Sequence, residues 1–406
     1  MSRAMFTAVS GLRNHQLWLD VIGNNIANAN TTGFKASDVI FEDILGQTLS
    51  AGSASASAGG TNPMQIGLGM KVSSISGNFE QGSIQPTNRN SDMAIQGDGF
   101  FVLTDGTDRV YTRAGAFNTD ANGNLVDATG LKVVGAAGPI QINIGQVVPA
   151  AASSNAKFKG NLDFSASDGA THVATVAIND SLGATHTLTV TFTKNFAAAA
   201  GQWDWAVTEA DTAITGLTTA TGSIVFNGSG AISSGASQDI GVTYAITAGV
   251  TTPQAITLDF GTVANATPMT GVASPSTVSL SSQNGTAAGT LLSFNVGLDG
   301  GITGFYSNGR SLVIDTVQLA TFANSAGLLR TGSNQFRESS ASGIANVGNP
   351  GIGGHGTVVA GALEQSNVDL AQEFTSMIIA ERGFQANART ISTVNQMLDE
   401  LVNLKR

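Results

Sequence analysis

The chain contains no cysteine among its 406 residues. Disulfide bridges and thiolate metal sites are therefore excluded, and the redox state of the protein's compartment cannot be inferred from its cysteines. Charged residues make up only 11% of the chain, and acidic residues outnumber basic ones by 28 to 18. A net charge of -10 opposes contact with a phosphate backbone, so the sequence predicts no nucleic-acid partner.

Long apolar runs are missing as well. No stretch approaches the roughly 18 uninterrupted apolar residues of a membrane helix, so we expect no membrane insertion. The first ten residues, MSRAMFTAVS, are amphipathic and lack the continuous apolar centre and the cleavage site of a secretory signal peptide. If the protein leaves the cell, we expect export without a cleaved signal peptide.

Small residues are abundant, and 50 of the residues are Gly. Such a composition suits short strands joined by tight turns. Residues 187–192 alternate polar and apolar side chains, as do 203–205 and 311–314, and Asn122-Gly123 and Asn308-Gly309 are turn signals. The sequence therefore predicts an all-β middle.

Both ends of the chain follow a helical pattern instead, with apolar residues recurring every seven positions. Near the N-terminus the repeat is Met5, Leu12, Leu19 and Ile26, with Ala8, His15 and Ile22 offset by three. Near the C-terminus it is Leu370, Met377, Phe384, Ile391 and Leu398, flanked by Val394 and Leu401. We predict a helix at each end.

The first helix should stop at Asn28, Asn30 and Gly33, which disfavour its continuation. Residues 46–60 are low in apolar bulk, and we expect a linker or a loop that orders only on contact.

The two apolar stripes could pair with each other as a hairpin within one chain. Burial of two lone helices roughly offsets the entropy lost in ordering them, so such a pair should be frayed in the monomer. Several copies packed together bury further faces of each helix. A stripe that contacts a different surface of the next copy builds an open helical tube. The sequence thus favours a self-assembling subunit.

Enzyme-like signals are weak, and we predict no catalytic, cofactor-binding or metal site. Residues 351–356 match G-x-G-x-x-G but follow Asn349-Pro350 instead of a strand, which indicates a turn. Residues 120–131 resemble a calcium loop but have Leu at its sixth and twelfth positions, which favours a hairpin. His15 lies on the N-terminal stripe, either as a register-setting polar contact or as a packed or edge-exposed residue.

Three segments, in order, resemble the flagellar rod and hook axial family. Residues 25–35 (NIANANTTGFK) are similar to the family signature that follows the first helix. Residues 81–102 resemble its next block, and 361–370 with 379–387 resemble its C-terminal block, where Glu381 replaces the usual Gln. The length and residues 299–310 are most similar to hook members. Residues 146–284 match nothing carried over from the family.

The resemblance implies a structural subunit of the bacterial flagellar hook and not an enzyme. Such a subunit self-assembles into a flexible helical tube, a universal joint that passes torque from rod to filament. Implied partners are other copies of the chain, the hook cap protein, the distal rod and hook-filament junction proteins, and the flagellar type III export apparatus. The implied location is the extracellular hook, joined to the basal body. A distal rod-type subunit and a secreted β-rich adhesin or binding module are the alternatives.

The implied fold is mainly β with helical termini, in nested discontinuous domains. Its expected parts are a coiled-coil-like helical domain (1–30 and 364–406), a linker (31–70 and 359–363), an inner β domain (71–145 and 285–358) and an outer β domain (146–284). The polymerisation core is expected at Met5, Leu12, Leu19, Ile22, Ile26, Leu370, Met377, Phe384, Ile391, Leu398 and Leu401. The family motif falls on Asn28, Asn30, Thr31, Gly33, Phe34, Lys35, Ser366, Asn367, Val368, Asp369, Arg382 and Asn387.

Overall fold

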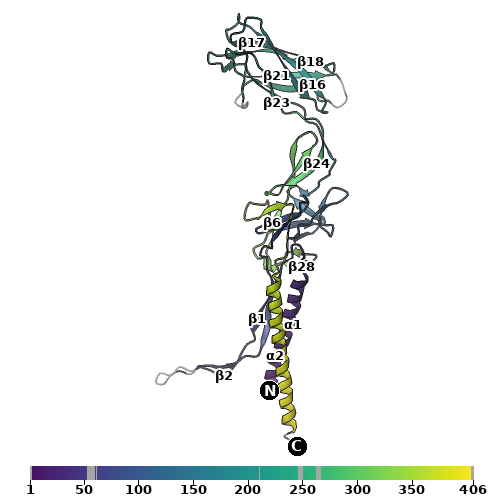
Figure 1. Ribbon diagram of the computed structural model, residues 1–406, viewed down its shortest axis with the longest axis vertical. Coiled ribbons are helices and arrows are strands. Elements are labelled where there is room, and N and C mark those ends of the chain that lie inside the picture. Colours follow the sequence, from purple (N-terminus) through teal and green to yellow (C-terminus); the bar gives the residue numbers. More distant parts are fainter. Residues whose placement is uncertain are drawn as a thin grey trace. The chain divides into compact units, whose positions relative to one another are not determined.

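The computed structural model describes residues 2–52, 60, 62–209, 211–245, 250–261 and 267–403. The described chain begins with helix α1 (Ser2–Ala27) and ends with helix α2 (Leu370–Asn403), and β-strands fill most of the sequence between them (Figure 1). This confirms the predicted fold class, mainly β with helical N- and C-terminal segments.

The chain forms two compact units. Unit 1 comprises Met1–Asn143, Phe294–Gly304 and Leu312–Arg406, and unit 2 comprises Ile144–Ser293 and Phe305–Ser311. Both are therefore discontinuous in sequence. The finer division into four parts stays a prediction.

The ends of the two helices follow from local chemistry. Helix α1 stops at Ala27, beyond which Ala29 donates its N–H to the carbonyl of Ile26, three residues back, so the last turn tightens. Helix α2 starts after Asp369, whose Oδ1 accepts the N–H groups of Ala371 at 2.9 Å and Gln372 at 3.2 Å. A carboxylate in this position satisfies N–H groups that have no partner within the helix.

An antiparallel ribbon follows α1 within unit 1. Its strands are β1 (Ser37–Asp43) paired with β4 (Met70–Gly77), and β2 (Gln47–Ser50) paired with β3 (Met64–Ile66). The prediction of a linker or loop over 46–60 was wrong at Gln47–Ser50, because the pairing with β3 gives this polar segment a hydrogen-bonded partner. Residues 53–59 of that segment lie outside the described residues.

The larger sheet of unit 1 surrounds an aromatic cluster. Phe79, Phe100, Phe322 and Phe336 meet Tyr111 or one another edge to face, with ring centroids 4.9–5.7 Å apart. In order of pairing the strands are β28 (Leu329–Gly332), β29 (Gln335–Arg337), β8 (Arg109–Thr112), β7 (Phe100–Thr104), β11 (Lys132–Gly135), β10 (Leu125–Val126) and β9 (Asn118–Thr119). Also attached are β12 (Gly138–Pro139) on β11, β27 (Leu319–Thr321) on β7, and β30 (Asn346–Gly348) on β27.

Two short strand pairs tie the C-terminal part of unit 1 to its N-terminal part. They are β31 (Thr357–Ala360) with β6 (Met93–Gln96), and β32 (Ala362–Glu364) with β5 (Ile84–Pro86). A 3-10 turn, η1, spans Ser325–Gly327. A further sheet has the order β13 (Val147–Val148), β24 (Gly289–Val296), β25 (Gly301–Tyr306) and β26 (Ser311–Thr316).

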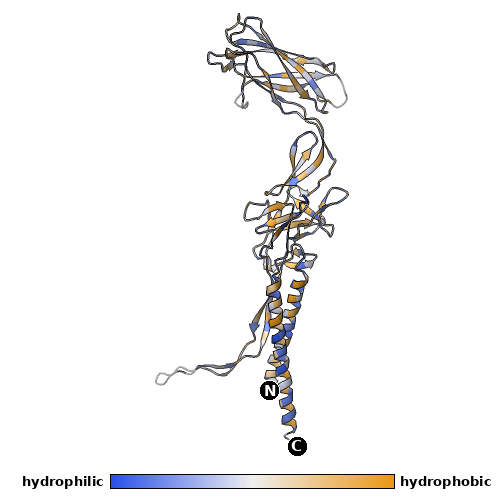
Figure 2. Ribbon diagram, viewed as in Figure 1, coloured by the Kyte–Doolittle hydropathy of each residue, from blue (hydrophilic) through white to orange (hydrophobic). Residues whose placement is uncertain are grey.

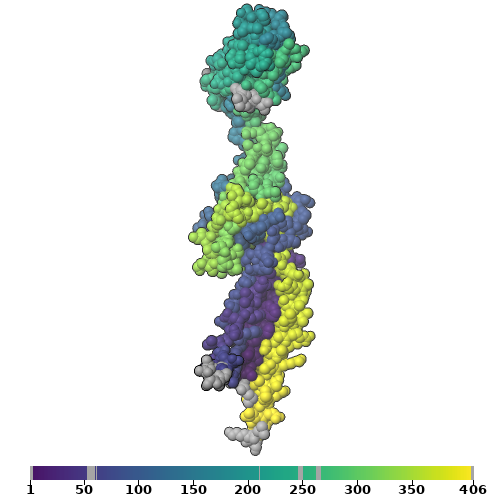
Figure 3. All heavy atoms as spheres, turned by 90° about the vertical axis from the view of Figure 1, so that its left-hand side faces the viewer, coloured from purple at the N-terminus to yellow at the C-terminus, as the bar shows by residue number. Residues whose placement is uncertain are grey.

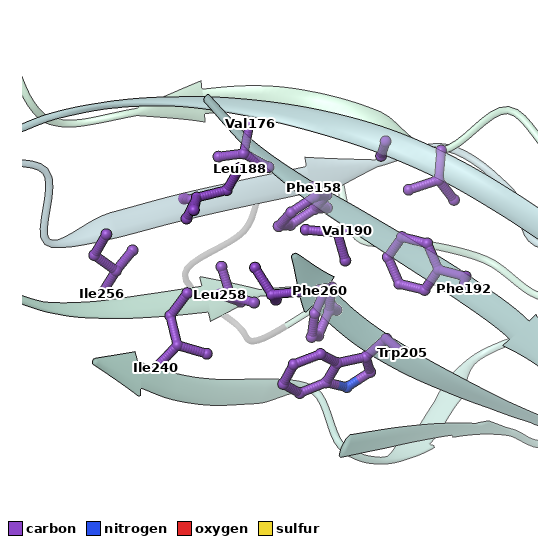
Figure 4. Close-up of a cluster of buried hydrophobic side chains, with 14 of the residues drawn as sticks. Phe158, Val176, Leu188, Val190, Phe192, Trp205, Ile240, Ile256, Leu258 and Phe260 are labelled. Atoms are coloured by element: carbon purple, nitrogen blue, oxygen red, sulfur yellow. The ribbon is translucent and has the colours of Figure 1, made fainter. Parts of the chain in front are cut away.

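Unit 2 contains two five-stranded sheets whose inward side chains form one core (Figure 4). One sheet has the order β15 (Thr171–Asn179), β16 (Thr185–Lys194), β17 (Gln202–Glu209), β19 (Thr221–Phe226) and β20 (Ile232–Ser234). The other has the order β18 (Ile214–Thr218), β21 (Ser237–Tyr244), β22 (Gln254–Asp259), β14 (Asn155–Lys159) and β23 (Ser279–Gln283). The alternation predicted for 187–192 and 203–205 is confirmed, since apolar residues of β16 and β17 are buried at every second position.

Phe260 lies at the centre of this core, with ring centroids 5.1 Å from Phe158, 5.9 Å from Phe192 and 5.8 Å from Trp205. We predict that Phe260→Ala lowers the stability of unit 2 by about 3 to 5 kcal/mol, because it leaves a cavity among rings that cannot close over it. Denaturant unfolding followed by tryptophan fluorescence measures this, since Trp203 and Trp205 lie in unit 2. Val173→Ala, at a side chain 54% exposed, is the control and should unfold like the parent chain. Equal midpoints for both variants would contradict the prediction.

Candidate functional site: the helical ends and their junction

Helices α1 and α2 lie side by side in unit 1 (Figures 1 and 3). Their contact is made by small residues facing polar ones. A Cβ on Gly11 would lie 2.6 Å from Nδ2 of Asn387, and a Cβ on Gly383 would lie 2.6 Å from Cε1 of His15. Asn387 also donates from Nδ2 to the carbonyl of Gly383 at 3.0 Å. Each glycine therefore admits a side chain of the other helix, and a larger residue would push the helices apart.

The buried face of α1 carries one half of the heptad repeat, which includes Ala8 and Ile22, and not the other half. Its buried side chains or backbones belong to Ala8, Gly11, Asn14, Ile22 and Asn25. Of the predicted core positions only Ile22 is among them. Met5, Leu12, Leu19 and Ile26 are half-buried on the flanks of this face.

Apolar and polar residues are interspersed along helix α2 (Figure 2), and most of its large apolar residues are exposed. Val394 and Ala380 are its only buried residues within the described range, and Met377 and Ile391 are half-buried. The predicted positions Leu370, Phe384, Leu398 and Leu401 are exposed, and so are Phe374, Ile378, Ile379, Met397 and Val402. Single exposed apolar side chains are ordinary, but a helix that exposes this many carries a large uncovered apolar surface.

His15 is a packed residue. Its ring contacts Gly383 and lies 6.1 Å from the ring of Trp18 and 6.3 Å from that of Phe41. Its Nδ1 is buried and has no hydrogen-bond partner in the described part of the chain. Burial lowers the pKa of His15, because the charged ring would lose its hydration.

A buried ionic network joins the start of the ribbon to the end of β32. The ammonium of Lys35 lies 2.7 Å from Oε1 of Glu364, and both side chains are 0% exposed. Lys35 also donates to the carbonyl of Glu80 at 2.6 Å, and Gly82 donates its N–H to Oε1 of Glu364 at 2.9 Å. On the other side, Nη1 of Arg113 lies 3.4 Å from Oε2 of Glu364. One carboxylate thus binds two cations and a backbone amide.

Desolvation lowers the pKa of both cations in this network. For Lys35 the hydrogen bond and the charge of Glu364 oppose the shift, and for Arg113 the charge of Glu364 does the same. The carboxylate therefore supplies the counter-charge for two buried cations.

Asparagine side chains fasten the neighbouring backbone. Asn25 donates to the carbonyl of Ser37 at 2.9 Å and accepts the N–H of Ser37 at 3.0 Å, and its Nδ2 also lies 2.8 Å from Oε1 of Glu373. Asn367 accepts the N–H of Ala36 at 2.9 Å and donates to the carbonyl of Asn78 at 3.0 Å. These bonds hold the chain on both sides of the two helices.

The remaining motif residues have separate roles. Gly33 has φ +67°, and a Cβ there would lie 2.5 Å from the backbone nitrogen of Ala114, so only glycine fits. Phe34 is buried, with the guanidinium of Arg330 5.5 Å from the centre of its ring. The other motif positions are outside the ionic network. Thr31 donates to the side chain of Asn28, and Asn30 is exposed. Ser366 accepts the N–H of Val368, Asp369 caps α2, and Arg382 donates to Gln385.

Sequence reasoning missed four residues of the junction: Asn25, Arg113, Arg330 and Glu364. Asn25 and Glu364 lie inside segments that carry the family resemblance, but neither has a spacing that marks an ion pair or a backbone clamp. Arg113 and Arg330 lie in segments with no motif at all. Only the fold brings them to Lys35 and Phe34.

The described residues contain no group of three or more His, Asp or Glu side chains that could hold a metal ion. The G-x-G-x-x-G segment is a turn, as predicted, with positive φ at Gly351, Gly353 and Gly354. The predicted hairpin at 120–131 is confirmed, and Asp120 accepts the N–H groups of Asn122 and Asn124. Among the described helices, none combines the length and apolar character needed to cross a bilayer.

Paired terminal helices on a β-rich body, joined by a structural ion network, define a structural subunit. Comparison with known proteins agrees. Family models match at residues 5–35 (flagella basal body rod protein), 94–163 (flagellar hook protein FlgE/F/G D1 domain), 141–286 (flagellar basal body protein FlaE D2 domain) and 359–404 (flagellar basal body rod FlgEFG protein C-terminal).

Curated relatives are similar over the whole chain. The flagellar hook protein FlgE of Treponema pallidum is 39% identical and that of Borreliella burgdorferi 37%, each with full coverage of both chains. The flagellar basal-body rod protein FlgG of Bacillus subtilis is 31% identical, also with full coverage of both. The chain belongs to the flagellar hook protein FlgE family. It is a structural subunit of the flagellar hook and not an enzyme, and neither alternative, rod subunit or adhesin, is favoured.

We predict that Glu364→Gln destabilises unit 1 by about 3 to 5 kcal/mol, because Lys35 and Arg113 then stay buried without a counter-charge. Thermal unfolding of the full-length chain measures the effect. Glu42→Gln is the matched control, since Glu42 pairs with Lys71 at 2.6 Å where both side chains are largely exposed. The control should melt like the parent chain. If the Glu364→Gln chain also unfolds at the temperature of the parent chain, this carboxylate does not stabilise unit 1.

A second prediction concerns the pH dependence of the helix contact. Because the pKa of His15 is lowered in the folded chain, the unfolded chain binds the proton more readily. The contribution of neutral His15 to the stability of the helix pair is therefore complete above the ordinary pKa of about 6.5 and is lost as the pH falls from there towards the lowered folded value. In His15→Phe, whose ring cannot be protonated, this loss should disappear. Helical circular dichroism of assembled protein on heating, at pH 7.5 and pH 5.5, compares the two chains, and equal losses would exclude His15 as the cause.

Proposed function

We propose that α1 and α2 together form the surface through which copies of the chain associate into a helical tube. The observation that carries this proposal is the exposed apolar surface of α2. Ile378 and Ile379 are 58% and 56% exposed although they lie on a helix already packed against α1. Water contact with side chains of this kind is unfavourable by about 1.5 to 3 kcal/mol each, so burial against other copies supplies a driving force.

The same surface accounts for a tube and not a closed dimer. The flanks of α1 and the exposed side of α2 are different surfaces, so a contact between α1 of one copy and α2 of the next is heterologous. Such contacts repeat without limit unless the rotation closes a ring. Other copies of the chain are therefore its first partners, and the helices gain much of their order on assembly.

We infer a mechanical role for the ionic junction in this assembly. Torque on the tube acts on α1 and α2, and it reaches the rest of unit 1 through the chain segments at Lys35 and Glu364. Ion pairs and amide clamps with 0% exposed side chains resist a change of angle better than apolar contacts, because their hydrogen bonds are directional. The junction thus transmits rotation while other contacts in the tube flex.

Several finer expectations belong to the same proposal. The nested division into a helical domain, a connector, an inner β domain and an outer β domain follows the family resemblance. So do the hook cap protein, the distal rod and hook-filament junction proteins, and the flagellar type III export apparatus as partners. Export without cleavage of a signal peptide is tested by the intact mass of the chain recovered from hooks.

We predict that Ile379→Asp abolishes tube formation and leaves the isolated chain folded, because position 379 faces solvent in the single chain and other copies in the tube. A buried unpaired carboxylate costs several kcal/mol, which exceeds the gain from any one contact. Electron microscopy under polymerising conditions and circular dichroism of the monomer measure the two effects. Gln396→Asp places the same charge at an exposed polar position of α2 and should still polymerise. Tubes of normal yield from Ile379→Asp would argue against α2 as the assembly surface.

A further inference from the structure

Asparagine is followed directly by glycine at four positions of the chain, which are Asn122, Asn227, Asn284 and Asn308. In such a pair the backbone nitrogen of the glycine can attack the side-chain amide carbon of the asparagine, because glycine has no Cβ to block the approach. All four pairs share this chemistry. The folded structure therefore decides which of them reacts.

Two of the pairs lie in the same kind of hairpin turn. Gly123 has φ +78° and donates its N–H to the carbonyl of Asp120 at 3.0 Å. Gly309 has φ +77° and donates its N–H to the carbonyl of Tyr306, also at 3.0 Å. The backbone at the attacking nitrogen is thus equivalent in the two turns, and a difference in reactivity must come from the rest of their surroundings.

The asparagine side chains of these two turns differ. Asn308 is held at both ends of its amide, since Oδ1 accepts the N–H of Arg310 at 3.1 Å and Nδ2 donates to the carbonyl of Ala287 at 2.8 Å. Asn122 is exposed, and its side chain makes no hydrogen bond to any part of the chain that the structure describes. Its amide carbon can therefore swing towards the nitrogen of Gly123 without losing a bond.

The strands on either side of each turn differ as well. Asn122 lies between β9 and β10, which are two residues long each. Asn308 lies between β25 and β26, which are six residues long each. A short strand pair opens locally at lower cost, because fewer hydrogen bonds must break. The nitrogen of Gly123 is consequently released from Asp120 more often than the nitrogen of Gly309 is released from its partner.

The remaining two pairs are also held by hydrogen bonds. Oδ1 of Asn227 accepts the N–H groups of Ser229 and Ala231, both at 3.0 Å, and the hydroxyl of Ser229 at 2.6 Å. Oδ1 of Asn284 accepts the N–H groups of residues 154 and 155 at 2.9 Å each. Both amides must therefore break hydrogen bonds before they can rotate towards the following glycine.

We propose that Asn122 is a site of spontaneous deamidation in the folded chain. The nitrogen of Gly123 loses its proton to hydroxide and bonds to Cγ of Asn122, while the Cγ–Nδ2 bond breaks and ammonia leaves with a proton from water. Water then opens the five-membered imide at one of its two carbonyls. Opening at Cγ gives an aspartate, and opening at the backbone carbonyl gives an isoaspartate. In total one water is consumed and one ammonia is released.

The modification changes the turn that carries it. The carboxylate of Asp120 already accepts the N–H groups of Asn122 and Asn124, both at 2.8 Å, so a second carboxylate in the same turn is repelled by the first. An isoaspartate also lengthens the backbone by one carbon. A Cβ on Gly123 would overlap Oδ1 of Asn143, so the turn retains the glycine that makes the site labile. The charge and the altered turn therefore accumulate with the age of the chain.

Incubation of the folded full-length chain at pH 8.5 and 37 °C, followed by peptide mapping with mass spectrometry, tests the assignment. We expect conversion at position 122 to be about tenfold faster than at position 308, because two hydrogen bonds of Asn308 must break first. Asn122→Gln, whose longer side chain closes a ring far more slowly, should lose this product and leave the other three sites unchanged. Equal or faster conversion at Asn308 would overturn the proposal.

The unfolded chain separates the effect of structure from that of sequence. In concentrated guanidinium chloride both asparagines are free and both precede glycine, so positions 122 and 308 should react at similar rates. A difference as large as in the folded chain would mean that local sequence and not the turn sets the rate, and the proposal would fall. It would fall equally if position 122 reacted only in the unfolded chain. None of these outcomes bears on the proposed function, since the reaction needs only one folded copy.

Discussion

The carboxylate of Glu364 is the group on which the rest of unit 1 depends. It accepts from Lys35 and Gly82 through one oxygen and faces Arg113 with the other. These partners lie in the N-terminal third of the sequence and Glu364 lies near its C-terminal end, so a single buried anion fixes where the chain leaves α1 and where it enters α2. Removal of Glu364 leaves two buried cations without a counter-charge, so the network depends on this one carboxylate.

The two helices that meet this junction pack against each other through small residues. Gly11 and Gly383 let α1 and α2 approach closely by admitting Asn387 and His15, and the space between the helices is thereby filled without large apolar side chains. The apolar residues are left on the outer flanks. A lone chain consequently has a rigid joint and an unsatisfied helical surface, which is the combination that a polymer of identical subunits requires.

The same features explain how far the sequence could be interpreted. Period and composition were enough for the two helices, the β middle, and the alternation in β16 and β17. The heptad repeat located one half of its positions, Ala8, His15 and Ile22, on the face of α1 that packs within the chain. It missed the rest of that face, because Gly and Asn carry no periodic apolar signal. The ion pair between Glu364 and Arg113 could not be predicted for a related reason. Its members are 251 residues apart, so no local sequence pattern marks them, and only tertiary structure brings them together.

Charge, which is scarce in this chain, separates two kinds of contact. At the junction, buried ions with directional hydrogen bonds admit one geometry, and the energy of a small rotation is high. The exposed apolar side chains of α2 differ, because apolar contacts are not directional and a small shift between them costs less energy. A flexible joint that still transmits torque needs both, because the stiff contacts must lie along the path of the torque and the degenerate ones where neighbouring subunits change their separation.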